Sequence, residues 1–116
     1  MSTDMELPTV EETIAFAKAH NFKFTRCSVG DSSCGCAMTI LVLMKKPELF
    51  NKSNVDYWTE FETIFGYKTY ELYCPFDDVS INPYAADFYC QSEKPFAVFG
   101  AKLALAAHAE KLFVWE

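Results

Sequence analysis

The sequence predicts a mainly α-helical fold, a single globular domain over residues 1–116 with four to five helices and one short β pair. The alternative is an α+β fold. Two observations favour helices: apolar residues recur every third or fourth position in several segments, and helix-capping or helix-breaking residues bound those segments. Since 51% of the 116 residues are hydrophobic, the chain can fill one core. Residues 1–8 are expected to fray.

The first helix is predicted over residues 9–20. Thr9 and Glu12 stand three positions apart, which is the spacing of a capping box at a helix start. Asn21 is a residue that adopts the left-handed conformation readily, and the apolar Phe22 follows it. This pair indicates the helix end.

Residues 22–27 are predicted to be extended, because apolar and polar residues alternate there and place Phe22 and Phe24 on one side. Residues 112–115 are four consecutive apolar residues near the end of the sequence. We expect them to pair with residues 22–27 as an edge strand.

The second helix is predicted over residues 33–46, with Ser32 or Ser33 as its cap and Pro47 as its stop. It is apolar on nearly all sides. A helix of that kind lies in the centre of a fold.

The third helix is predicted over residues 54–65. It begins near Ser53 and Asp56, which resemble a capping pair, and ends at Gly66, a natural C-cap.

Residues 67–92 are the hardest part to interpret. Residues 67–74 fit either a short strand or one or two helical turns, with Pro75 closing the element. Residues 77–83 carry acids, Asn and Pro and indicate a surface loop, and residues 85–90 fit one more helical turn.

The last helix is predicted to start within Ser92-Glu93-Lys94-Pro95, which combines a cap, an acid and a proline. Its small residues allow another backbone to approach closely.

The cysteines offer the first candidate chemistry. In the predicted second helix Cys34 would lie in the first turn, where the positive end of the helix dipole favours a thiolate. Cys34, Cys36 and His108 are therefore candidate catalytic residues, as a thiol nucleophile or sensor with its base. A zinc-stabilised domain is an alternative, with Cys27, Cys34 and Cys36 as candidate ligands, although their spacing matches no known finger or ribbon. The third interpretation is that these thiols are buried packing residues, and on balance we expect no cofactor and no enzyme activity.

Charge narrows the classes of partner. The chain has 16 acidic and 10 basic residues, a net charge of −6, and no concentrated basic patch. Nucleic acids and anionic membranes are therefore disfavoured as partners. The start of the chain lacks the features of a secretory signal, so we expect reduced cysteines in the cytoplasm.

The middle of the chain offers the second candidate site, because tyrosines alternate there with acids. Tyrosine is enriched in contact surfaces, since it supplies area and a hydroxyl at low entropic cost. We therefore expect a small acidic binding module that docks on another protein, most simply a basic one. A homodimer through the C-terminus and the small-residue face of the last helix is also compatible with the sequence. The candidate docking residues are Tyr67, Tyr70, Tyr73, Asp77, Asp78 and Tyr84.

Overall fold

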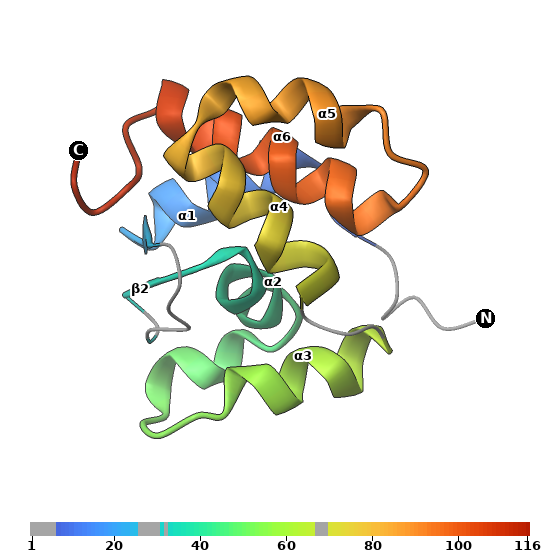
Figure 1. Cartoon of the computed structure of the whole chain (residues 1–116). Coiled ribbons are helices and arrows are strands. Elements are labelled where there is room, and N and C mark those ends of the chain that lie inside the picture. The colour runs from blue at the N-terminus through green and yellow to red at the C-terminus, as the bar shows by residue number, and fades with distance from the viewer. Residues whose placement is uncertain (1–6, 26–30, 32, 67–69) are drawn as a thin grey trace.

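The computed structural model describes residues 7–25, 31, 33–66 and 70–116, and it confirms a mainly α-helical fold with one short β pair (Figure 1). The helices are α1 (Val10–Ala19), α2 (Ala37–Lys45), α3 (Tyr57–Phe65), α4 (Tyr70–Ile81), α5 (Ala86–Cys90) and α6 (Pro95–Ala109), the 3-10 helices are η2 (Pro47–Asn51) and η3 (Pro83–Ala85), and the strands are β1 (Lys23–Phe24) and β2 (Cys34–Gly35). The described residues thus form one α-helix more than the upper number predicted. The radius of gyration, 12.9 Å, is that of a compact chain of this length.

Helix α2 lies in the middle of the fold and contacts α1, α3 and α4 (Figure 1). Its first seven residues, 37–43, are all buried, which confirms the prediction of a central helix. It ends just before Pro47, as predicted. Its start, however, is four residues later than predicted: Cys34 and Gly35 form β2, and Cys36 is the N-cap.

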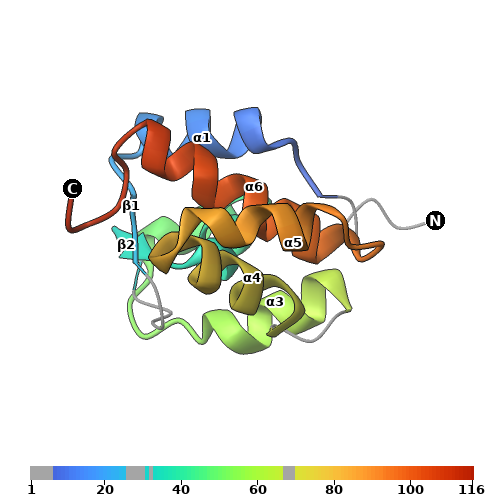
Figure 2. The ribbon, with the colours of Figure 1, turned by 45° about the horizontal axis from the view of Figure 1, so that its top comes forward.

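Helices α4 and α6 form the most extensive helix pair. A Cβ atom built on Gly100 of α6 would lie 2.7 Å from the carbonyl oxygen of Leu72 in α4, so the glycine permits a close backbone approach. Figure 2 shows α6 between α1 on one side and α4 on the other. The small residues of α6 therefore serve packing within the chain, and Gly100 is not available for the homodimer contact that the sequence suggested.

Helix α4 corrects two predictions. Pro75 lies inside the helix and does not end it, and the acidic stretch predicted as a loop continues the helix to Ile81. Proline in a helix interior removes one backbone hydrogen bond and is unfavourable by about 3 kcal/mol relative to alanine. Burial of one face of α4, including Leu72 and Phe76, against the rest of the core offsets that cost.

Helices α1 and α6 end in the same way. Asn21 follows α1 with a φ of 56°, and the backbone N–H of Phe22 donates to the carbonyl of Ala17 at 2.8 Å. Lys111 follows α6 with a φ of 57°, and the N–H of Leu112 donates to the carbonyl of Ala107, five positions back as in α1, at 2.9 Å. Both ends are Schellman motifs, and the first was predicted from the Asn21 and Phe22 pair.

The two helix ends lead into the small sheet. Strand β1 pairs in parallel with β2, with Lys23 opposite Cys34, and Phe24 forms a parallel bridge with Phe113. This confirms the predicted pairing of the C-terminal segment with residues 22–27. Phe22 and Phe24 are both fully buried with their ring centroids 5.4 Å apart.

The remaining caps follow the sequence closely. Thr9 and Glu12 form the predicted capping box of α1. Asp56 caps α3, so this helix begins at Tyr57 and not at residue 54, and Gly66 ends it with a φ of 70°. Helix α6 begins at Pro95, inside the segment predicted for its start, but its N-cap is Lys94 and not Ser92.

Within the described residues, no helix has the length and apolarity needed to cross a bilayer.

Candidate functional site

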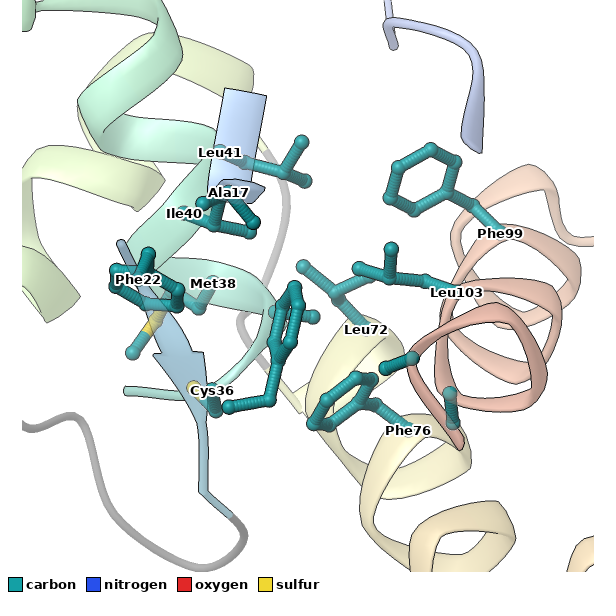
Figure 3. Close-up of a cluster of buried hydrophobic side chains, with 14 of the residues drawn as sticks. Ala17, Phe22, Cys36, Met38, Ile40, Leu41, Leu72, Phe76, Phe99 and Leu103 are labelled. Atoms are coloured by element: carbon teal, nitrogen blue, oxygen red, sulfur yellow. The ribbon is translucent and has the colours of Figure 1, made fainter. Parts of the chain in front are cut away.

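Cys36 is part of the core. Only 4% of its surface is exposed, and it lies with buried side chains of α2, α4 and α6 (Figure 3). Burial raises the pKa of its thiol, and the nearby carboxylate of Asp77 raises it further, although hydrogen bonding from Thr39 and from the backbone of Met38 lowers it. A neutral, buried thiol is a poor nucleophile, so the structure gives Cys36 a packing role.

Cys34 lies in β2, two residues before the N-cap of α2, so it is not in the first helical turn as the sequence suggested. Its position is set by a turn at Asp31, whose Oδ1 accepts the backbone N–H groups of Ser33 at 2.8 Å and of Cys34 at 3.2 Å. Hydrogen bonds from the Ser33 hydroxyl and these N–H groups lower the pKa of Asp31. The half-buried Cys34 is therefore held by backbone geometry and lacks the favourable helix position.

A polar pocket of about 440 Å³ lies beside this turn, lined by Asp31, Ser33, Lys52, Ser53, Asn54, Val55 and Tyr57. Among the described residues, its wall includes no cysteine and no histidine. The pocket therefore does not supply the cleft in which a thiol and an imidazole would meet.

His20 and His108 both lie at helix C-termini, and neither contacts Cys34. The ring of His20 stacks on Phe50 with centroids 4.4 Å apart. His108 donates through Nε2 to the carbonyl of Ser80 at 2.9 Å, and its Nδ1 lies 3.4 Å from Oε2 of Glu116. These contacts tie α6 to α4 and to the C-terminus, so the structure assigns His108 a structural role.

The structure brings no metal-binding cluster together among the residues that it describes: no three His, Cys, Asp or Glu side chains gather at one point. Cys27, one of the three candidate ligands, lies outside the described residues. Cys74 and Cys90 are exposed thiols on α4 and α5.

The predicted docking residues separate into different environments. Tyr67 and the side chain of Tyr70 lie outside the described residues. Tyr73 is half-buried, and its ring lies 5.6 Å from that of Trp58 on α3. Asp77 is only 8% exposed, which corrects the expectation that it belongs to a surface loop. Of the predicted docking residues whose burial the structure describes, only Asp78 and Tyr84 are fully on the surface.

Three large apolar side chains are exposed where α4 turns through η3 into α5. Ile81 is 61% exposed, Tyr84 89% and Phe88 76%, and we call this set the corner patch. Figure 1 shows α5 and the turn before it at the outer edge of the fold. Large apolar side chains grouped on a surface are typical of interaction sites. Sequence reasoning named Tyr84 but missed Ile81 and Phe88.

A shallow pocket of about 360 Å³ lies within the corner patch, and we call it the corner pocket. It is lined by Asp78, Ile81, Asn82, Ala85, Phe88 and Tyr89. Most of its lining side chains are apolar, and Asp78 contributes its charged group. The pocket thus joins α4 to α5 across η3.

One hydrogen bond fixes the wall of this pocket. The hydroxyl of Tyr89 in α5 donates to Oδ2 of Asp78 in α4. This bond raises the pKa of Tyr89 to about 12, with smaller contributions from burial and from the charges of Asp78 and Cys74. This bond joins α5, a helix of five residues in which only Ala86 is buried, to α4.

The segment that forms the patch is also uniformly acidic. Residues 70–93 contain five carboxylates and no Lys, Arg or His. Of these acids, Asp78 and Asp87 are exposed beside the corner patch in sequence. The patch therefore combines apolar area with negative charge.

No protein-family model, curated protein or solved structure matches this chain.

Proposed function

We propose that this protein is a small, non-enzymatic binding module that docks through the corner patch on a basic, amphipathic surface of another protein. The observation that carries the proposal is the exposure of Ile81, Tyr84 and Phe88, which lie on three consecutive elements, α4, η3 and α5. Docking would remove this apolar area from water, which is the main favourable contribution to protein association.

Charge supports a basic partner. The exposed acids of residues 70–93 have no basic residue of their own segment to compensate them. A partner with Lys or Arg around an apolar centre would complement the patch and would associate faster at low salt. A reducing, cytoplasmic setting fits the cysteines that the structure describes, all of which are free thiols.

The first step of the test identifies the protein that contacts the corner patch. A photo-crosslinking amino acid at position 84 is compared in the native cells with one at Glu48, an exposed residue of η2 outside the patch. The protein that cross-links only from position 84 is then purified, and its affinity is measured for the wild-type chain and two variants. The combined change of Ile81→Ser and Phe88→Ser removes the patch, and Val114→Ser is the matched control because Val114 is also an exposed apolar residue.

We expect the patch variant to bind at least about tenfold more weakly, with an unchanged thermal midpoint, and the control variant to bind as the wild type does. Raising the salt concentration should weaken wild-type binding. Equal affinity of all three chains would overturn the proposal. Cross-links that join only two copies of this chain would replace it with a homodimer.

A further inference from the structure

The corner pocket is lined by three different kinds of side chain, and these limit the chemical class of ligand that fits it. Ile81 and Ala85 give it an aliphatic side, Phe88 and Tyr89 give it aromatic rings, and Asp78 gives it a carboxylate. A ligand that fills it needs an apolar stem and a cationic end. Among the side chains of a partner protein, those of arginine and lysine have this form.

The carboxylate retains an oxygen for such a ligand. Oδ2 of Asp78 accepts the Tyr89 hydroxyl, and no described residue donates a hydrogen bond to Oδ1. No ion pair joins Asp78 to another described residue, and residues 70–93 contain no Lys or Arg that could form one within the segment. The negative charge at the pocket is therefore not neutralised by its own segment.

The aromatic rings favour arginine over lysine. Phe88 meets Tyr89 edge to face, with centroids 5.1 Å apart and an interplanar angle of 79°, so Phe88 is held at an angle and stays 76% exposed. A planar guanidinium stacks on an exposed ring and can still donate to a carboxylate, whereas an ammonium is a compact, strongly hydrated charge.

We propose that the corner pocket binds an arginine side chain of the partner, with its stem on Ile81 and Ala85, its guanidinium on the face of Phe88 and a hydrogen bond to Oδ1 of Asp78. This inference rests on the proposed docking function, of which it names the recognition element.

The pocket is tested on the intact chain without any partner. Isotope-labelled protein is titrated with millimolar N-acetyl-arginine amide, and the backbone amide signals are followed by NMR. The N-acetyl amides of lysine, citrulline and norleucine are the matched probes: citrulline keeps the shape of arginine without its charge, and norleucine keeps only an apolar stem. We expect shifts confined to the pocket residues, largest for arginine, smaller for lysine, and small for the two uncharged probes.

Two conservative variants locate the contacts. Phe88→Leu keeps an apolar side chain without a ring, and we expect it to bind the arginine probe about two- to fivefold more weakly. Asp78→Asn keeps an acceptor for Tyr89 without the charge, and we expect it to abolish the preference for arginine over citrulline. Equal shifts from arginine and citrulline, shifts outside the pocket, or no shifts would each overturn the arginine assignment.

The two proposals fail separately. If the arginine probe shifts the pocket signals but the patch variant still binds the partner normally, the docking function is wrong. If the patch variant no longer binds the partner while the probe shows no preference for arginine, the docking function is supported and the assignment of an arginine to the corner pocket is wrong.

Discussion

Helices α5 and α6 follow each other in the chain and both contact α4. The phenylalanines of α6 are buried, whereas the phenylalanine of α5 is exposed. The fifteen residues of α6 bury Phe96 and Phe99 in the core. The five residues of α5 bury only Ala86 and leave Phe88 76% exposed. The difference follows from length, because a helix of little more than one turn can present only one or two residues to the core.

The comparison shows which apolar residues the fold requires. A polar residue at position 88 would leave both the burial of Ala86 and the Tyr89 hydrogen bond to α4 unchanged. Phe96 and Phe99 could not be replaced in this way without loss of core packing. Phe88 therefore contributes little to folding, and this is why we infer that its apolar surface serves binding.

The largest expected effect comes from truncating the same residue type in each region. Phe76 is fully buried, with the rings of Phe24 and Phe113 at centroid distances of 5.6 and 5.7 Å. We expect Phe76→Ala to lower the free energy of unfolding by about 3–5 kcal/mol, since it leaves a cavity. The control, Phe88→Ala, should change it by no more than about 0.5 kcal/mol. Urea unfolding of both variants measures the contrast, and similar losses in both would show that α5 belongs to the core.

An intermediate effect tests how α5 is held. The hydrogen bond to Asp78 raises the pKa of Tyr89 to about 12 from its usual 10.0, so the Asp78–Tyr89 bond contributes stability that is complete below pH 10 and is lost as the pH rises to about 12. Absorbance titration of tyrosinate should show one tyrosine that ionises last. Tyr89→Phe should remove that step, and Asp78→Asn should move it to lower pH because it removes the negative charge beside the hydroxyl.

The titration of Tyr89→Phe can contradict the assignment of the late step to Tyr89. If the titration of Tyr89→Phe equals that of the wild type, the late step belongs to another tyrosine, and the attachment of α5 to α4 has to come from packing alone.

Local signals in the sequence predicted the parts of the fold that depend on neighbouring residues. The capping box of Thr9 and Glu12 and the left-handed Gly66 are set by hydrogen bonds within one turn, so sequence spacing sufficed. Pro75 is the opposite case. Its local preference is to end a helix, but packing of α4 on α6 decides the outcome, and the close approach at Gly100 becomes visible only in three dimensions.

The full set of residues in the candidate site could not be identified from the sequence either, because the secondary structure of residues 70–81 was open. Asp77 and Asp78 are adjacent in sequence, but successive residues of a helix point about 100° apart, which leaves one buried and the other exposed. While residues 70–81 could be strand, loop or helix, their faces could not be assigned. The exposure of Ile81 and Phe88 depends in turn on how η3 redirects the chain, and tertiary contacts determine that.

The smallest expected effect concerns the cysteines, of which one is buried in the core and others are exposed on the surface. Cys36 is buried in the core, and burial raises the pKa of its thiol, whereas Cys74 and Cys90 are exposed on α4 and α5. Alkylation requires an accessible thiolate, so we expect iodoacetamide near pH 8 to label Cys74 and Cys90 first and Cys36 last. Peptide mass spectrometry at successive times measures the order, and labelling in denaturant, where every thiol should react at a similar rate, is the control. Fast labelling of Cys36 in the native chain would show that this end of the core opens, and it would return the Cys34–Cys36 segment to consideration as a reactive site.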